Sequence, residues 1–253
     1  MSRRPVMSAS LVAVLALLAT ACGRTDGASE NVDSVASAAP TITTATPFVP
    51  EPSRPVTQPA PEPTTVIATP EARAFTDQLW TPFAGVGRIT LRHPASRVEL
   101  IGFHESNHEG AQQLSALPGA VRPRTLPTRG RLTTARTAAD VVVDPAKQIR
   151  APATGRVKRA GTYVLYCKYS DDYVVIEPDS HPGWEVKLLH VDHEIVNVGD
   201  HVTAGETIIA PRATKLPFAS DVDEFTASPH WPHVHIEVVD PSIPNRPSPG
   251  SGC

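Results

Sequence analysis

Apolar residues beyond residue 80 occur in short runs that are rich in valine, isoleucine and tyrosine. Glycine, proline, aspartate or asparagine separates neighbouring runs, and each run is three to seven residues long. Short β-branched runs with such breaks are typical of strands in an all-β domain. Residues 109–117 have a helical pattern instead, and Ser170, Asp171 and Asp172 predict a hairpin turn. The predicted strands are residues 98–103, 141–143, 163–169, 173–177, 184–190, 207–209 and 233–239.

The first residues of the chain follow a different pattern. Two arginines precede an apolar run at residues 11–19, and small residues lead to Cys22. A charged start, a short apolar run and small residues are typical of a secretory signal. The cysteine resembles the end of a bacterial lipobox, although Ala19 stands where that motif prefers leucine. This resemblance implies a signal peptide at residues 1–21 and a diacylated Cys22. Two acyl chains would anchor the protein stably in a membrane.

We therefore expect an exported lipoprotein, held at the outer face of the bacterial cytoplasmic membrane through Cys22. The alternative is ordinary secretion with an unmodified cysteine.

Composition separates residues 22–79 from the folded part. Nine of the 27 prolines lie between Pro40 and Pro70, and the segment carries few charges. Such a segment buries too little apolar surface to offset its ordering entropy. Its prolines favour extended polyproline geometry. We predict a disordered tether that holds the folded part on the order of 100 Å from the membrane.

Histidines concentrate in the folded part. All ten lie between His93 and His235, and three of them fall within residues 229–235. Residues two apart on a strand share a face, so His233 and His235 project side by side. One imidazole can then bind a metal while the other faces the group that the metal activates. Alone, this spacing is a weak signal.

Four segments together resemble one family. Residues 232–238 (PHVHIEV) resemble the terminal His-x-His strand of lysostaphin/LytM-type zinc endopeptidases of peptidoglycan. Residues 151–157 (APATGRV) match the family's Ala-Pro-x-x-Gly-x-Val segment, and residues 189–191 (LHV) resemble its Tyr-x-His-Leu strand. Residues 198–208 (VGDHVTAGETI) follow its Val-Gly-Asp turn. The four segments occur in the family's order, which is more specific than any one of them.

The resemblance implies a fold and a domain organisation. We expect a mainly β, LytM-like antiparallel sheet domain of the duplicated hybrid motif type, with a groove, at residues 129–245. Residues 80–128 would form the N-terminal part of the folded region, and residues 246–253 a C-terminal tail.

The resemblance also implies site residues. Asp140 and His235 match zinc ligands, and His190 and His233 match the histidines that orient or deprotonate the attacking water. Zinc lowers the pKa of its bound water toward ~7 and polarises the scissile carbonyl. The expected substrates are stem or cross-bridge peptides of peptidoglycan.

One position departs from the family pattern. The first zinc ligand of the family is a histidine four residues before the aspartate, and Arg136 stands there. A guanidinium has no lone pair to donate, and a catalytic zinc normally has three protein ligands. Arg136 would then pair with Asp140 in place of a metal, in an inactive module that binds the wall or regulates a partner hydrolase. The competing hypothesis is a third ligand from elsewhere.

Three histidines are candidates for that ligand. Residues 104–108 spell His-Glu-x-x-His, the zincin signature, which requires a long helix. A predicted strand directly before this motif favours a chance match over an independent zincin site. A softer hypothesis is that one of the three candidates folds back to complete the site of Asp140 and His235. The candidates are His104, His108 and His230.

Two cysteines remain after Cys22. Cys167 lies within a predicted strand and Cys253 is the last residue. An even pair in an exported protein is typical of a disulfide. The alternative is a buried, free Cys167.

Charge adds one more feature. The formal net charge of −3 argues against a nucleic-acid partner, which favours basic domains. Residues 85–136 nevertheless carry eight arginines against three glutamates. This basic stretch either attracts carboxylates of wall peptides and anionic wall polymers or pairs with the acidic remainder of the chain.

Overall fold

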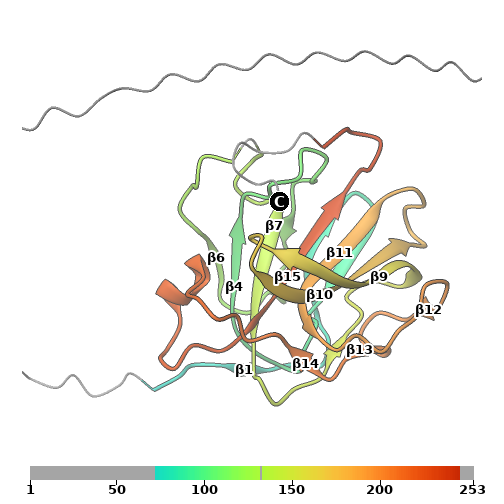
Figure 1. The fold of residues 1–253 in the computed structure, drawn as a ribbon. Helices are drawn as coiled ribbons and strands as arrows, with labels where there is room; N and C mark the ends of the chain where they lie inside the picture. The colour runs from blue at the N-terminus through green and yellow to red at the C-terminus, as the bar shows by residue number, and fades with distance from the viewer. Residues whose placement is uncertain (1–71, 132, 246–253) are drawn as a thin grey trace, which may run out of the picture. The chain divides into compact units, whose positions relative to one another are not determined.

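The computed structural model describes residues 72–131 and 133–245 (Figure 1). The signal peptide, Cys22, most of the predicted tether, Cys253 and the C-terminal tail lie outside the described residues, so these predictions stay predictions. The described part contains no helix that is long and apolar enough to cross a membrane.

A ten-stranded sheet dominates the described residues. Its strands pair antiparallel, except that β6 runs parallel to β4. The predicted fold class, mainly β with antiparallel strands, is therefore confirmed. The order is β1 (Thr76–Asp77), β4 (Arg97–His104), β7 (Ala138–Val143), β15 (His233–Val239), β11 (Glu185–Asp192), β10 (Tyr169–Pro178), β9 (Gly155–Leu165) and β12 (His201–Val202), with β6 (Pro123–Thr125) on β4 and β14 (Arg212–Ala213) on β11.

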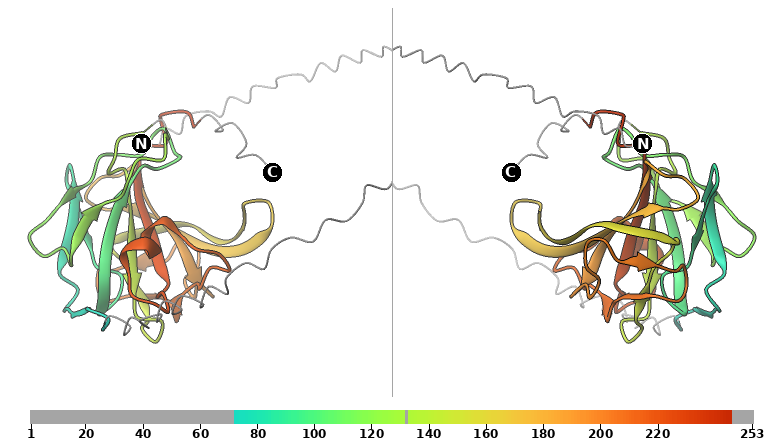
Figure 2. Two further views of the ribbon diagram at one scale, coloured as in Figure 1. Left: turned by 90° about the vertical axis from the view of Figure 1, so that its left-hand side faces the viewer. Right: turned by 90° about the vertical axis from the view of Figure 1, so that its right-hand side faces the viewer.

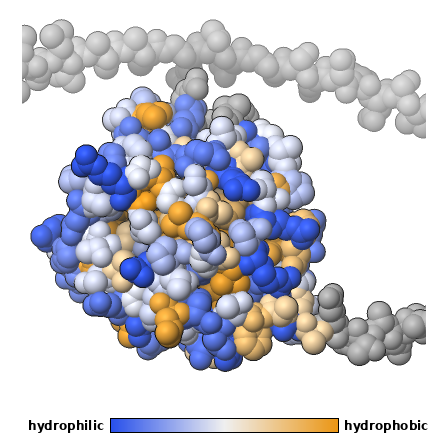
Figure 3. Space-filling model, turned by 180° about the vertical axis from the view of Figure 1, so that it is seen from behind, coloured by the Kyte–Doolittle hydropathy of each residue, from blue (hydrophilic) through white to orange (hydrophobic). Residues whose placement is uncertain are grey.

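Two smaller sheets and one 3-10 helix complete the fold. The helix η1 (Asp221–Phe225) is the only helical element among the described residues. Seen from behind, polar and apolar residues are interspersed on the surface (Figure 3). The smaller sheets are β3 (Ile89–Arg92), β2 (Pro82–Val86) and β5 (Ser115–Ala116), and β13 (Ile208–Ala210) with β8 (Ile149–Arg150).

Apolar residues are buried on both faces of the central strands. All six residues of β7 are buried. Val141 and Val143 belong to the main core, whereas Val142 packs with Leu100 and Val222 in a second, smaller cluster. Successive strand residues point to opposite faces, so β7 needs the continuous apolar pattern of a strand covered on both sides. The face with the smaller cluster also carries the candidate site.

Two details of the predicted elements were wrong. Residues 109–117 form no helix, and β5 lies within them. The turn between β9 and β10 lies at residues 166–168 rather than at 170–172, because Leu165 pairs with Tyr169. Tyr166 and Cys167 have φ of 51° and 55° there. Because these side chains favour β-strands, the sequence pattern predicted a strand where the chain turns. The tip of this turn curls away from the sheet in Figure 2.

Gly155 lies where β9 and β10 approach closely. A Cβ at this position would lie 2.1 Å from the backbone oxygen of Glu177. We expect Gly155→Ala to lower the free energy of unfolding by about 1–3 kcal/mol, as overpacking does. Urea denaturation measures this change.

Gly85→Ala is the matched control for that experiment. Its new Cβ would lie 3.4 Å from the nearest backbone atom, the Ile89 oxygen, and alanine is favoured over glycine within a strand. Equal losses of stability in the two variants would contradict the close approach of β9 and β10.

Candidate metal centre

Three polar residues meet where β7 lies between β4 and β15. Asp140 of β7 lies opposite His235 of β15 and opposite Gly102 of β4. His104 lies two residues further along β4, opposite Ala138. Opposed and alternate residues of an antiparallel sheet share a face. His104, Asp140 and His235 therefore project from the same face of the sheet.

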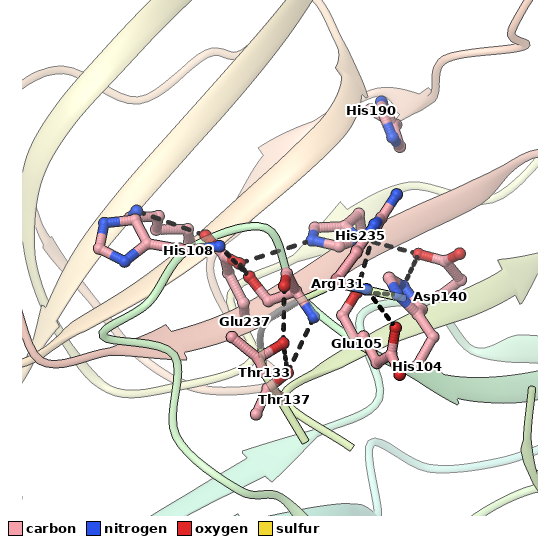
Figure 4. Close-up of polar contacts among 12 residues, drawn as sticks. His104, Glu105, His108, Arg131, Thr133, Thr137, Asp140, His190, His235 and Glu237 are labelled. Carbon is pink, nitrogen blue, oxygen red and sulfur yellow. Dashed lines mark hydrogen bonds and ion pairs between the residues drawn. The ribbon is translucent and has the colours of Figure 1, made fainter. Parts of the chain in front are cut away.

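The three side chains converge on one carboxylate oxygen. Asp140 Oδ1 lies 3.0 Å from His104 Nε2 and 2.9 Å from His235 Nδ1. One donor atom from each of the three residues lies within 4.8 Å of the others. His104 and Asp140 are buried, and His235 is nearly so. Figure 4 shows this cluster.

The contacts of the two ring nitrogens of His104 indicate whether a metal ion fits at the cluster. His104 Nδ1 lies 2.8 Å from the backbone oxygen of Glu105, which can only accept. The lone pair of Nε2 points toward the cluster when Nδ1 carries the proton and donates to Glu105, and in that tautomer Nδ1 cannot also accept from Arg129 Nη2, which lies 2.7 Å away. Nε2 is buried and, among the described residues, takes part in no hydrogen bond. Its contact with Asp140 Oδ1 at 3.0 Å is an ion-pair contact without hydrogen-bond geometry, and a cation between Nε2 and Asp140 would satisfy both buried atoms.

The types of donor atom in the cluster also suit a metal ion. Two imidazole nitrogens and one carboxylate oxygen are a ligand set that proteins use for zinc, with a further position left open in catalytic sites. The residues present therefore fit a zinc ion, held by His104, Asp140 and His235.

Charges around the cluster favour a cation. Burial opposes ionisation of Asp140, but the imidazoles of His104, His233 and His235 outweigh it and hold its pKa well below its usual range. Burial lowers the pKa of His235, yet Asp140 and Glu237 raise it to about 9. The same two carboxylates would attract a metal ion in place of that proton.

Glu237 supports His235 from the next alternate position of β15. Its carboxylate lies 3.9 Å from His235 Nε2, accepts a hydrogen bond from Ser106 Oγ at 2.5 Å, and lies 3.3 Å from Lys187 Nζ. Burial disfavours its ionisation, but His235 and Lys187 lower its pKa to about 2. A carboxylate on the outer nitrogen of a ligating imidazole orients the ring.

His190 and His233 flank the cluster. Their rings lie 5.0 Å apart, and His233 Nε2 lies 3.8 Å from Asp140 Oδ1. Consecutive strand residues normally point to opposite faces, yet His190 and Leu189 line the same pocket. The φ of His190 is 63°, in the left-handed region that few residues other than glycine adopt. This backbone turn brings the ring to the site.

Asp171 fixes the orientation of His190. Its Oδ2 accepts hydrogen bonds from His190 Nδ1 at 2.6 Å, from the His190 backbone nitrogen at 3.1 Å and from the Tyr163 hydroxyl at 2.7 Å. Burial and the nearby Asp171 raise the pKa of Tyr163, so the hydroxyl stays a donor. With Nδ1 bound to Asp171, Nε2 of His190 is the nitrogen left for chemistry.

These residues line one pocket of about 500 Å³. Such a volume is within the range of small-molecule and short-peptide sites. Aromatic and aliphatic side chains line the same pocket, namely Tyr163, Leu165, Tyr166, Leu189, Leu216 and Phe218.

The structure places the other sequence candidates outside the cluster. Arg136 donates from Nε to Thr125 Oγ1 at 2.9 Å, and its guanidinium lies over the Phe103 ring. The predicted pairing of Arg136 with Asp140 is therefore wrong. The reason is that His104, from the neighbouring strand, occupies the position beside Asp140.

His108 and His230 are also not part of the group of three. Nδ1 of His108 accepts from the Gly110 backbone nitrogen, and Nδ1 of His230 lies 3.0 Å from Thr226 Oγ1. Residues 104–108 contain the end of β4 and a loop, so the zincin motif is a chance match.

Sequence reasoning missed two residues of the site. Asp171 was predicted as a turn residue, and Glu105 as part of a chance motif. Glu105 accepts from the backbone nitrogens of Arg129 and Arg131 at 3.1 and 2.9 Å and from Thr128 Oγ1. It thereby holds the loop that carries both arginines against the pocket. No local signal marks either carboxylate, because their partners are distant along the chain.

Comparisons with known proteins add little to this geometry. No family model matches the sequence, and no curated protein does. A solved structure described as a zinc-containing peptidase from Vibrio cholerae is similar over 60% of this chain, at 20% sequence identity and a TM-score of 0.29. The similar region spans 37% of that structure's chain. A likeness at this level assigns no activity to the chain described above.

Proposed function

We propose that the chain is a zinc-dependent hydrolase that acts on peptides of peptidoglycan. The observation that carries the proposal is the convergence of His104, Asp140 and His235, flanked by His190 and His233, in one pocket. The sequence resemblance to lysostaphin/LytM-type endopeptidases supports the substrate class. The lipid anchor at Cys22 and the tether belong to the same proposal and would place the domain at the wall.

His104 supports hydrolysis in spite of the arginine at position 136. With His104 in the cluster, three residues could ligate a zinc ion, which is the number of protein ligands in catalytic zinc sites. The alternative of an inactive wall-binding or regulatory module rested on a missing third ligand and on Arg136 pairing with Asp140, and Arg136 contacts Thr125 and Phe103 instead. Hydrolysis is therefore the function that the geometry favours.

A bound zinc ion would lower the pKa of its water and polarise a carbonyl. Residues of the chain itself would transfer the proton and stabilise the developing negative charge. Burial is the largest effect on His233 and lowers its pKa to about 3, so the ring is neutral near pH 7 and its single N–H can donate a hydrogen bond to a developing oxyanion.

His190 is the better proton carrier. A proton taken up at its Nε2 would give an imidazolium whose Nδ1–H donates to the ionised Asp171. Burial raises the pKa of Asp171, but His190 and Tyr163 lower it overall, so the carboxylate stays charged. His190 can thus accept a proton from water and deliver it to the leaving amine.

The proposal is tested by incubating the purified full chain with peptidoglycan. We expect new amino termini to appear with the zinc-loaded protein, to disappear after chelation and to return when zinc is added back. Protein with one zinc per chain that releases no termini from peptidoglycan of several cross-link types would contradict the proposal.

A further inference from the structure

Arg131 lines the same pocket as the cluster but forms no ion pair within the part of the chain that the structure describes. Its Nη1 donates to the backbone oxygen of Glu105 at 2.8 Å. Among residues 72–131 and 133–245, no carboxylate lies within ion-pair distance of its guanidinium. The neighbouring Arg129 differs, because it pairs with Asp221 and its Nη2 lies 2.7 Å from His104 Nδ1.

The surroundings of Arg131 make an unpaired cation costly. The side chain is half-buried, and burial together with the like charge of Arg129 lowers the pKa of its guanidinium by more than the more distant Tyr166, Asp140 and Asp221 raise it. A guanidinium nevertheless stays protonated in proteins. A partly buried charge that keeps no counter-ion is unfavourable unless an anion completes the site.

The position of Arg131 tells where that anion would lie. Arg131, Asp140, His190 and His235 line one pocket, and Figure 4 shows the four side chains in one view. The apolar wall of Leu165, Tyr166 and Phe218 belongs to the same pocket. A group bound at Arg131 would therefore be attached to the molecule that faces the cluster.

We propose that Arg131 binds a carboxylate of the substrate, so that the site prefers peptides with a free carboxylate close to the scissile bond. The planar fork of a guanidinium matches a carboxylate with two parallel hydrogen bonds. The carboxylate is either the C-terminal one or that of an acidic side chain. The inference that the ligand is a peptide rests on the proposed function. The inference that this ligand carries a carboxylate rests on Arg131.

Peptide binding to the zinc-loaded full chain tests this proposal without a need for turnover. The probes are acetyl-trialanine with a free C-terminal carboxylate, the same peptide as its amide, and acetyl-Ala-Ala-Glu amide, each made with L- and with D-residues. We expect at least one carboxylate probe to bind about tenfold or more tightly than the neutral amide, since hydrogen bonds between charged groups are worth that much. The stronger of the two carboxylate probes identifies the source.

Variants assign the preference to Arg131. Arg131→Gln should remove it, and Arg131→Lys should keep only part of it, because lysine retains the charge without the fork. Arg136→Gln is the matched control, an arginine of the same basic stretch that contacts Thr125, and it should bind like the wild type. Zinc content is measured for every variant. If Arg131→Gln loses zinc, the preference for carboxylate probes over the amide is compared between the wild type and Arg131→Lys instead.

Three results would overturn the inference: equal affinity for the amide and the acids, no binding of any probe at 10 mM (about ten times a weak Kd of 1 mM), or a preference that survives loss of Arg131. A preference that depends on Arg131 in a protein without hydrolytic activity would leave the inference standing and count against the proposed function alone.

Discussion

Replacement of His104 by alanine is expected to empty the metal centre. His104 Nε2 lies 3.0 Å from Asp140 Oδ1 and is a buried nitrogen without a hydrogen bond among the described residues. Its removal leaves two ligands, Asp140 and His235. Even outer-shell changes cost about 10- to 100-fold in metal affinity, so loss of this ligand should weaken zinc binding by more than about 100-fold.

The measurement is zinc per chain after dialysis against a weak chelator, with thermal unfolding to show that the variant is folded. His108→Ala is the matched control, because His108 belongs to the same His-Glu-x-x-His sequence but lies outside the group of three. Arg136→Ala should also retain zinc. Zinc binding that persists in His104→Ala and disappears in His108→Ala would reverse the assignment.

Replacement of His233 by alanine is expected to stop hydrolysis while zinc stays bound. His233 lies beside the cluster, with Nε2 3.8 Å from Asp140 Oδ1, and its ring packs against His190. General acid–base and oxyanion groups contribute about 10²- to 10⁴-fold to rates. We expect a loss in that range in the release of amino termini from peptidoglycan.

His230→Ala is the control for this second experiment. It lies three residues from His233, and Thr226 and Lys215 contact it away from the cluster. Its activity should equal that of the wild type. An inactive His233→Ala variant that has also lost its zinc would assign His233 to metal binding rather than to catalysis.

The sequence was a good guide to the strands and to two of the three residues of the candidate centre. Asp140 and His235 were predicted from motif resemblance, and the structure brings them within 2.9 Å of each other. His104 was only one of three candidates. Its position depends on the register of β4 against β7, where His104 lies opposite Ala138, and a register between distant strands leaves no mark in either strand alone.

Two other features lay beyond sequence reasoning for a similar reason. His190 reaches the site because its φ of 63° breaks the alternation of β11, whereas a strand pattern predicts the opposite face. Asp171 looked like a turn residue because aspartate favours turns. It is instead buried within β10, and three of its hydrogen bonds join β9, β10 and β11 at His190.

The metal content of the purified full chain tests the central claim most directly. After loading with zinc and removal of the excess, elemental analysis should find one zinc per chain, and chelation should release it. A folded chain that remains without zinc after loading would contradict a centre formed by His104, Asp140 and His235.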